Sequence, residues 1–403
     1  MNEPLSVREA PASYMLDAQR VRPGYKQTEV GLIPEDWDVA NLGRTCTQVT
    51  TGKLDANAMK ENGEYRFYTC AKDYYQIDTY AFDTEALLVS GNGANVGYIH
   101  YYKGKFNAYQ RTYVLSGFLD SIKYLQHYMG QKLADRIRVE VNAGNTPYIT
   151  RGTLTEMKVA LPPTKAEQEA IAEVLSDADA LIDQLTQLIA KKHHLKQGAM
   201  QELLTGKKRL PGFSGEWEVK LFGEITQPRR ERIAPRRAGV QKFCIELEHI
   251  AQGTGCLVGY TETGEGSSLK SVFQQDDVLF GKLRAYLRKY WLANREGVCS
   301  TEIWVLVAKR SLLIPQFLFQ LVKVDRFVEV ASSAYGTHMP RSDWNVVKNY
   351  EVRLPHVEEQ TAIATILSDM DADIAALEQQ LAKARGIKQG MMQELLTGRI
   401  RLV

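Results

Sequence analysis

The sequence predicts an α+β protein in which two mixed α/β domains alternate with two long helices. Three observations lead to this fold class: the 403 residues exceed what one hydrophobic core usually organises, one segment occurs twice, and a dissimilar strand-rich segment precedes each copy. An apolar fraction of 44% and a charged fraction of 24% are typical of a folded globular protein. We therefore expect at least two hydrophobic cores.

The repeated segment occupies residues 167–210 and 359–402, and 27 of its 44 positions are identical. A similarity of this length fixes the order of the parts before any local structure is considered. The chain is predicted to divide into an N-terminal extension at 1–22, a first domain at 23–160, a central helical region at 161–210, a second domain at 211–353 and a C-terminal helical region at 354–403.

The two domains resemble each other only at their edges. Each begins near a tryptophan, Trp37 or Trp217, and each ends with a Leu-Pro pair, at 161–162 or 354–355. Their interiors differ in sequence, although both contain short alternating runs typical of strands, followed by one helical stretch near 119–138 or 315–330. The order is therefore variable, constant, variable, constant.

The constant regions are predicted to be long helices with an apolar stripe. Pro162 and Pro163 exclude helix before this point, and Thr164 can cap a helix that has Glu167 three residues further on. Apolar residues then recur at spacings of three and four, as in a coiled-coil seam: Ile171, Leu175, Ala178, Ile182, Leu185 and Ile189, and again Ile363, Leu367, Met370, Ile374, Leu377, Leu381, Ala384 and Ile387.

The stripe leaves two arrangements open. The helices either pair with each other or with a common partner, or each packs only on its own domain. Antiparallel pairing of the two copies would relate the domains by a pseudo-two-fold axis. A helix of about 40 residues spans roughly 60 Å, so two dissimilar domains on such spacers suit a DNA target that is read in two parts, because major-groove sites recur every ~34 Å.

Several classes of protein are not supported by the sequence. No apolar run approaches the roughly 20 residues that cross a bilayer, and residues 1–22 lack the centre of a secretory signal, so we expect a cytoplasmic protein. The five cysteines form no C-x-x-C pair and are expected to be reduced. The adjacent histidines at 193–194 do not share a helical face as metal ligands would.

Catalytic motifs are also missing from the sequence. Gly52-Lys53 and Gly206-Lys207 do not continue into a Walker A motif, and no Asn-Pro-Pro-Tyr loop is present to hold a flipped base. The glycines at 91, 93 and 97 miss dinucleotide-binding spacing and are predicted to form a tight turn. The sequence therefore predicts a protein without a catalytic site or a cofactor of its own.

Candidate DNA contacts are cations, amides, hydroxyls and aromatic side chains in or beside predicted loops. Cations neutralise phosphates, and Arg, Lys, Asn, Gln and Ser reach base edges, whereas the alternative is an ordinary solvated face. The first domain contributes Lys53, Lys72, Asn92, Asn95, Gln110, Arg111, Asn145, Thr146, Tyr148 and Arg151. The second, whose net charge is +4, contributes Arg229, Arg230, Arg232, Lys282, Arg284, Tyr286, Arg288, Ser300, Thr301, Thr337, His338 and Arg341.

Other residues occur twice regardless of the domain attached to them. They serve either a shared structural need or the docking of two copies of a partner. These predicted partner-binding residues are Glu167, Gln168, Gln201, Glu202, Leu203 and Leu204, with Glu359, Gln360, Gln393, Glu394, Leu395 and Leu396.

Taken together, these stretches resemble the specificity subunits of type I restriction-modification systems. The resemblance covers nearly the whole chain and is carried by residues 25–31, the Leu-Pro entries, both Gln-Glu-Leu-Leu-Thr-Gly endings, residues 277–284 and residues 299–302. It implies two target-recognition domains separated by conserved helices, in a subunit that chooses the DNA sequence. It also implies two copies of a DNA adenine methyltransferase subunit and motor-nuclease subunits as partners, with S-adenosylmethionine, ATP and Mg in those partners.

The two halves depart from each other inside the domains. Residues 89–95 and 109–111 of the first domain differ from 279–282 and 299–301 of the second, so we expect an asymmetric rather than a palindromic target. The alternative function is a stand-alone DNA-binding regulator that uses the same two domains without partners. Tight, sequence-specific binding by the isolated chain would distinguish it.

Overall fold

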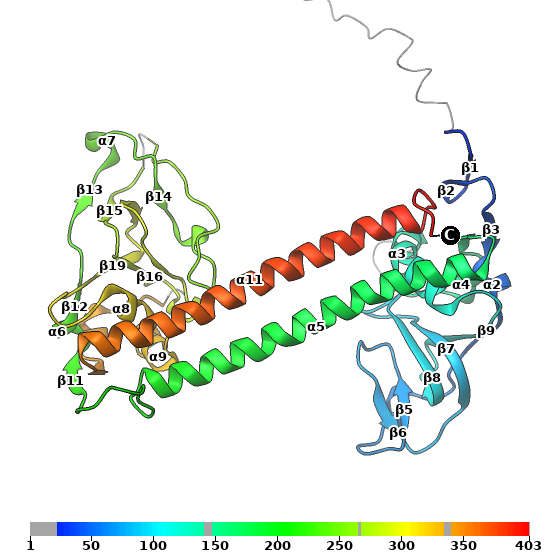
Figure 1. Ribbon diagram of the computed structural model, residues 1–403, viewed down its shortest axis with the longest axis horizontal. Coiled ribbons are helices and arrows are strands. Elements are labelled where there is room, and N and C mark those ends of the chain that lie inside the picture. The colour runs from blue at the N-terminus through cyan, green and yellow to red at the C-terminus, as the bar shows by residue number, and fades with distance from the viewer. Residues whose placement is uncertain (1–21, 141–146, 265–266, 334–339, 403) are drawn as a thin grey trace, which may run out of the picture. The chain divides into compact units, whose positions relative to one another are not determined.

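The computed structural model describes residues 22–140, 147–264, 267–333 and 340–402. The predicted N-terminal extension, apart from Arg22, lies outside the described residues. The chain divides into two compact units, Met1–Leu185 with Gln380–Val403 (unit 1) and Thr186–Gln379 (unit 2). Both boundaries fall inside long helices, α5 (Lys165–Leu203) and α11 (Val357–Leu395), so each unit contains one half of each helix (Figure 1).

Unit 1 is built on a six-stranded sheet of order β4-β9-β7-β8-β5-β6, in which only the β5–β8 pair is parallel. Its strands are β4 (Cys46–Thr51), β5 (Tyr65–Tyr68), β6 (Tyr75–Ile77), β7 (Phe82–Ser90), β8 (Ile99–Ala108) and β9 (Thr112–Phe118). All of Ala86–Ser90 is buried, as expected for a strand in the middle of a sheet that is covered on both faces.

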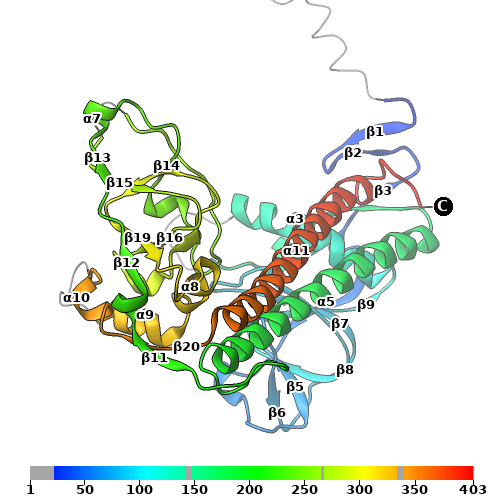
Figure 2. The same cartoon turned by 60° about the vertical axis from the view of Figure 1, so that its left-hand side comes forward.

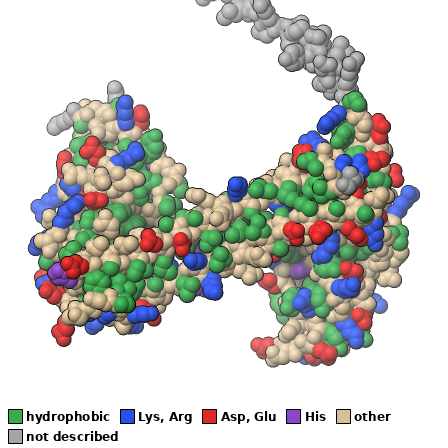
Figure 3. Space-filling view, in the orientation of Figure 1, with side chains coloured by type: hydrophobic (Ala, Val, Ile, Leu, Met, Phe, Trp, Pro, Cys, Tyr) green, Lys and Arg blue, Asp and Glu red, His purple; other side chains and the backbone are tan. Residues whose placement is uncertain are grey.

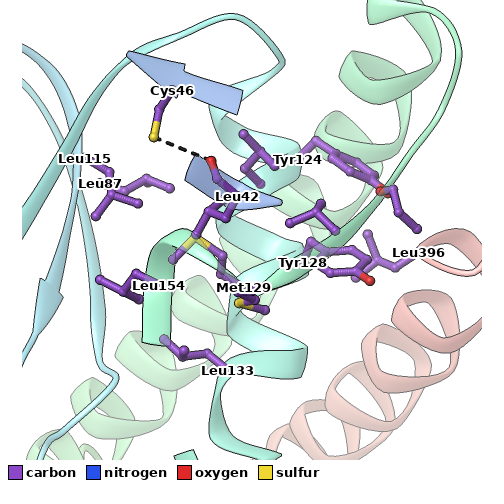
Figure 4. Packing of buried hydrophobic residues seen from close by; sticks show 14 of the residues in the cluster. Leu42, Cys46, Leu87, Leu115, Tyr124, Tyr128, Met129, Leu133, Leu154 and Leu396 are labelled. Carbon is purple, nitrogen blue, oxygen red and sulfur yellow. Dashed lines mark hydrogen bonds between the residues drawn. The ribbon is translucent and has the colours of Figure 1, made fainter. Parts of the chain in front are cut away.

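The helix α3 (Ile122–Glu140) confirms the helical stretch predicted near 119–138. Its Tyr124 and Tyr128 are buried beside Leu396, which follows α11, while Leu87 and Leu115 approach the same core from the sheet (Figure 4). The unit is completed by β1 (Tyr25–Thr28), β2 (Gly31–Pro34), α2 (Leu42–Thr45) and α4 (Arg151–Thr155).

Unit 2 contains two four-stranded sheets. One has the order β12-β19-β16-β17, with β12 (Thr226–Pro228), β19 (Ile303–Ala308), β16 (Val278–Gly281) and β17 (Tyr290–Leu292). The other has the order β13-β15-β18-β14, with β13 (Arg232–Ile233), β15 (Lys270–Phe273), β18 (Gly297–Ser300) and β14 (Cys244–Ile245). The short helix α6 (Phe222–Ile225) precedes these strands in the chain, α7 (Pro235–Ala238) lies between β13 and β14, and α10 (Trp344–Val347) follows them.

The helical stretch predicted at 315–330 is wrong as a single helix. It consists of α8 (Pro315–Leu321) and α9 (Asp325–Ser332), because Val324 adopts an extended backbone with φ −64° and ψ 136°. The side chain of Lys323 at this break is 5% exposed, and its Nζ lies 3.0 Å from Oδ2 of Asp371 on α11. The break therefore places a buried cation against the long helix.

The matching edges of the two domains pair with each other inside each unit. In unit 1, β3 (Asp38–Asn41) is antiparallel to β10 (Lys158–Leu161), and in unit 2, β11 (Glu218–Leu221) is antiparallel to β20 (Glu351–Leu354). Each two-stranded ribbon joins the entry of a domain to its exit, immediately before a long helix. This shared junction explains why the edges agree while the interiors differ.

In each unit, segments of α5 and α11 lie side by side (Figures 1 and 2). In unit 2, Lys192 approaches Asp373 and Lys196 approaches Asp371, so the two segments run antiparallel. The predicted cap is confirmed, since the Glu167 backbone N–H donates to Thr164 Oγ1 at 3.2 Å. Every residue of the predicted apolar stripe is buried or half-buried except Ile387, which is 51% exposed.

The described residues include no helix that is both long enough and apolar enough to cross a membrane. All five cysteines are free thiols, as expected.

Candidate nucleic-acid interface

The candidate DNA contacts of the first domain come together at one end of the unit 1 sheet. Backbone hydrogen bonds tie their loops to each other: Gln110 N–H donates to Leu54 O at 2.8 Å, Gly91 N–H to Arg111 O at 2.8 Å and Ile149 N–H to Gly91 O at 2.9 Å. The tight turn predicted at 91–97 is confirmed, with Gly93 and Gly97 at φ 79° and 82°. Five loops distant in sequence therefore form one surface.

Most of the predicted side chains on this surface are available to a ligand. Those exposed are Lys53, Lys72, Gln110, Arg111, Tyr148 and Arg151. Asn92 and Asn95 are half-buried, and Asn95 Nδ2 donates to Cys70 O at 3.0 Å, which gives this amide a role in holding the loop. Asn145 and Thr146 lie outside the described residues.

A half-buried histidine supports the same loops. His100 Nε2 lies 3.0 Å from Ala71 O, and burial lowers the pKa of His100 below its usual value of 6.5. The ring is therefore neutral at pH 7 and donates its N–H to that carbonyl. Near neutral pH, this loop should not change its charge.

In unit 2, several predicted contacts line one cavity of about 540 Å³. Arg230, Arg232, Lys282 and Thr301 belong to it. Its polar and aromatic lining also includes five residues that were not among the predicted contacts, Gln227, Ser271, Trp304, Trp344 and Lys348. Trp304 and Trp344 pack edge to face at 5.7 Å, and five cations, Arg229 included, line the cavity with them, a composition that suits a nucleic acid.

Two of the predicted DNA contacts have structural partners instead. Arg229 donates from Nε and Nη2 to the buried carboxylate of Asp277 at 2.9 and 3.0 Å. Arg288 donates to Asp325 Oδ1 at 2.5 Å and to Lys323 O at 3.3 Å. Because these guanidinium groups neutralise or satisfy groups of their own domain, we correct their expected role to one of support.

The remaining predicted contacts of the second domain lie around the end of β16. Arg284 and Tyr286 are exposed, and Ser300 is half-buried. Arg341 is 58% exposed at its side chain although its Nε lies 3.0 Å from Glu302 Oε2. Thr337 and His338 lie outside the described residues.

The two domains share a backbone hydrogen-bond pattern at these surfaces, which we call the recognition frame. In unit 1 the bonds are Gly91 N–H to Arg111 O, Ile149 N–H to Gly91 O and Gly93 N–H to Pro147 O. In unit 2 they are Lys282 N–H to Glu302 O, Ser342 N–H to Lys282 O and Arg284 N–H to Pro340 O. Isolated bridges also correspond, Asn92 with Tyr148 and Leu283 with Arg341.

The frame carries different side chains in the two domains. Gly91 corresponds to Lys282, Arg111 to Glu302 and Tyr148 to Arg341. One backbone arrangement therefore presents an aromatic residue and one cation in unit 1, and cations with a carboxylate in unit 2. Such surfaces have different hydrogen-bonding patterns.

Eight of the twelve predicted partner-binding residues are buried within the chain. Gln168 Oε1 accepts from Ser121 N–H at 2.9 Å, and Gln360 Oε1 accepts from Ile314 N–H at 3.0 Å. The others buried are Glu167, Glu359, Leu203, Leu204, Leu395 and Leu396. Their repetition reflects the structural need that was the alternative, so we remove them from the docking surface.

The other four lie at the surface or close to it. Gln201, Glu202 and Gln393 are exposed, and Glu394 pairs with Arg399 at 3.4 Å. Two of them, Gln201 and Gln393, line equivalent grooves, one in each unit. The groove in unit 2 has a volume of about 620 Å³ and that in unit 1 about 440 Å³.

Each groove is lined by the same five repeat positions. In unit 2 these are His193, Lys196, Gln197, Met200 and Gln201, and in unit 1 Arg385, Lys388, Gln389, Met392 and Gln393. The lysines also have equivalent partners, since Lys196 pairs with Asp371 and Lys388 with Asp179. The two grooves thus share five lining positions of the repeat, whereas the rest of each lining differs.

On the face that Figure 3 shows, charge is not concentrated in one large field. Figure 3 shows Lys and Arg side chains interspersed with Asp and Glu over the face in view, and the net charge of the chain is +2. No group of three His, Cys, Asp or Glu side chains in the described part of the chain is placed to bind a metal ion. Recognition of an anionic ligand must therefore depend on local groups such as those of the unit 2 cavity.

Comparison with known proteins agrees with this geometry. The family model described as the type I restriction modification DNA specificity domain matches residues 34–192 and 237–384. The type I restriction enzyme EcoDI specificity subunit of Escherichia coli is 29% identical over 408 residues, which cover 92% of this chain and 90% of that protein. The MjaVIII specificity subunit of Methanocaldococcus jannaschii is 24% identical, with coverage of 92% and 94%.

A solved structure has a similar fold. The S subunit of a type I restriction-modification system from M. genitalium superimposes with a TM-score of 0.63 at 15% identity, and the match covers 93% of this chain and 98% of that one.

Proposed function

The chain belongs to the type I restriction modification DNA specificity family, and from this premise we propose that its two domains read the two dissimilar halves of an asymmetric DNA target. As a specificity subunit it is a DNA-recognition subunit and is not itself catalytic. The observation that supports the two-part target is the recognition frame, which presents different side chains in the two units. Two domains that share a backbone arrangement but present different side chains suit a DNA target whose two halves differ in sequence.

The side chains of each surface indicate how the halves differ. The first domain offers Gln110, Arg111 and Tyr148, a set that suits adenine edges, guanine edges and apolar contacts. The second offers Arg230, Arg232, Lys282 and Lys348 around one cavity, a set that suits phosphates and guanine edges. We therefore expect the second half of the target to depend more on guanine and its binding to depend more on salt.

Specificity subunits of this family bind DNA and assemble with other subunits. We propose that the two equivalent grooves each dock one copy of a DNA adenine methyltransferase subunit, because a repeated surface suits a repeated partner. Motor-nuclease subunits complete the proposed complex, and S-adenosylmethionine, ATP and Mg act in the partners rather than in this chain. The proposed location is the cytoplasm, where the target DNA lies.

The number of methyltransferase subunits on groove variants tests this docking. Gln201→Lys and Gln393→Lys change exposed residues at equivalent positions, so the fold should be unaffected. Each variant should reduce the bound methyltransferase from two copies to one, and the double variant should bind none, as measured by native mass spectrometry. Lys191→Gln, an exposed change on α5 outside the groove, is the control. Two bound copies on the double variant would overturn the docking proposal.

DNA selection provides the test of the target. The chain, assembled with its methyltransferase, is incubated with a pool of random duplexes, and the bound sequences are read. Two dissimilar short motifs at a fixed separation are expected. A single continuous palindrome, or no enriched sequence, would contradict the proposed target. High-affinity selection by the chain without methyltransferase would favour the stand-alone regulator instead.

A further inference from the structure

Two arginines in the second domain hold a backbone conformation that L-amino acids rarely adopt. Arg284 has φ 54° and ψ 57°, and Arg288 has φ 50° and ψ 49°, so both are left-handed. They flank a single turn of 3-10 helix at Ala285–Leu287. Glycine adopts this conformation readily, whereas a Cβ atom makes it unfavourable.

The first domain has glycine at both equivalent positions. Ser90 N–H donates to Tyr98 O at 2.9 Å as Gly281 N–H donates to Lys289 O at 2.8 Å. Inside these loops, Val96 N–H donates to Gly93 O and Leu287 N–H donates to Arg284 O. Gly93 therefore corresponds to Arg284 and Gly97 to Arg288. The same turn is made without strain in one domain and with two strained arginines in the other.

The strain at Arg288 has an intramolecular explanation. Its guanidinium donates to Asp325 Oδ1 and Lys323 O, which connects the turn to the break between α8 and α9. A glycine at this position could not make that connection. Arg288 is therefore a supporting residue of the turn.

Arg284 has no such explanation among the described residues. Its backbone N–H is held by Pro340 O at 2.9 Å, but none of the described residues forms a hydrogen bond, an ion pair or a cation–π contact with its guanidinium. The side chain is exposed. A strained backbone that presents an unpaired side chain is typical of a ligand-binding position.

The neighbours of Arg284 are suited to DNA. Tyr286, two residues on, is 53% exposed, and Arg341 is brought alongside by the bridge between Leu283 and Arg341. Lys282, two residues before, lines the unit 2 cavity. Two further cations, Lys282 and Arg341, thus lie beside a position whose own guanidinium has no partner among the described residues.

We propose that Arg284 is a specificity-determining residue, whose guanidinium reads the O6 and N7 edge of one guanine in the target half that the second domain binds. This inference rests on the proposed function, and it assigns the recognition of one base in the second half of the target to one side chain. Arginine donates two parallel hydrogen bonds to that edge, which no other base presents in the major groove. The Arg284 side chain is exposed, and the frame bond to Pro340 holds the backbone from which it extends.

The variant Arg284→Gly removes the guanidinium and relieves the strained backbone together. The full chain, assembled with its methyltransferase, should therefore melt at the same temperature or a higher one. At one guanine of one target half, discrimination against the other three bases should fall roughly 10- to 100-fold, while every other position keeps its preference. Methylation rates on a set of single-base target variants provide the measurement.

Two further variants separate a base contact from a charge effect. Arg284→Lys keeps the charge but loses the two-pronged geometry, so it should relax the same position while the dependence of binding on salt is unchanged. The control variant is Arg310→Gln, which changes an exposed arginine just after the last residue of β19. It should leave the base preference at every target position as it is in the unchanged chain.

The outcomes are distinct. If Arg284→Gly weakened binding equally for all target sequences and lowered the log–log salt slope by about 1, Arg284 would be a phosphate contact. That result would overturn the proposal. Unchanged discrimination with Arg284→Gly would overturn it as well. Failure of the proposed function itself appears separately, as an unchanged chain that shows no two-part preference at all.

Discussion

Arg209 holds Glu359 by two parallel hydrogen bonds across 150 residues of sequence, Nε to Oε1 at 2.6 Å and Nη2 to Oε2 at 2.7 Å. In unit 1, Arg401 holds Glu167 in the same way and also binds Asp36 at 3.0 Å. Both glutamates lie in the first turn of a long helix, and both arginines follow the end of the other long helix in the same unit. Each unit is thus closed by residues from both copies of the repeat.

Loss of one of these carboxylates should destabilise the unit that contains it. Glu167→Gln leaves Arg401 with Asp36 as its only carboxylate partner, and the loss of the charged hydrogen bonds to Glu167 should cost roughly 1 to 3 kcal/mol. Urea unfolding of the chain measures this cost. The matched control is Glu169→Gln, which removes an exposed carboxylate two residues further on the same helix. Equal stability of the two variants would contradict the structural role of the ion pair.

His127 should make unit 1 sensitive to acid. Burial, with smaller contributions from Lys388 and Lys123, lowers the pKa of His127 from 6.5 to about 4, and Asp179 only partly opposes this. Because the folded state binds fewer protons than the unfolded state between these values, the stability is complete above pH 6.5 and is lost as the pH falls towards 4. A shift of this size corresponds to roughly 3 kcal/mol at most.

The chain provides the matched variant for this prediction. Gln320 in unit 2 makes the equivalent contact, with Nε2 3.4 Å from Ser368 Oγ, whereas His127 Nε2 lies 3.1 Å from Ser176 Oγ. His127→Gln should therefore keep the hydrogen bond and remove the titration. Unfolding measured at pH 7 and at pH 4.5 should show a smaller loss for the variant than for the unchanged chain. The same loss in both would show that His127 does not cause the acid sensitivity.

The repeat made the long helices predictable, because a 44-residue similarity and an apolar period survive without any tertiary information. The cap at Thr164 and the turn at Gly91–Gly97 were predictable for the same local reason. The burial of Gln168 and Gln360 could not be predicted from the sequence. Repetition alone cannot distinguish a shared partner from a shared internal bond, and these amides bond to residues 46 or more positions away.

The site was predictable in part. Loops that carry cations and amides were found from composition, but Arg229 and Arg288 pair with Asp277 and Asp325, which are distant in sequence. Conversely, Trp304 and Lys348 line the unit 2 cavity although no local motif in their segments predicted this. Position in the sequence identifies candidate contacts, whereas only the fold separates a supporting cation from an available one.

Arg232, in the lining of the unit 2 cavity, should contribute affinity through a phosphate without contributing sequence preference. Arg232→Ala removes one exposed guanidinium from the cavity lining. We expect a uniform loss of affinity for all targets and a log–log salt slope lower by about 1. Titrations at several salt concentrations measure both. Lys309→Ala, at the end of β19 away from the cavity, should behave like the unchanged chain, and a base-specific effect of Arg232→Ala would contradict a phosphate contact.

Exchange of a whole domain should change one half of the target. Residues 211–353 include β11 and nearly all of β20, the ribbon that joins the second domain to its helix, so a related domain can be inserted at a shared junction. We expect the hybrid chain to keep the half-site read by the first domain and to acquire a new second half. Selection from random duplexes reads both halves at once. A change in both halves would show that the two domains do not read independently.

The central claim is that this chain selects a two-part, asymmetric DNA sequence for modification by a partner. It is tested most directly by mapping methylated bases across the genome of cells that carry the methyltransferase with and without this chain. We predict one methylated motif made of two dissimilar parts at a fixed separation, present only when the chain is present. Methylation of the same motif in the absence of the chain, or a continuous palindromic motif in its presence, would contradict the claim.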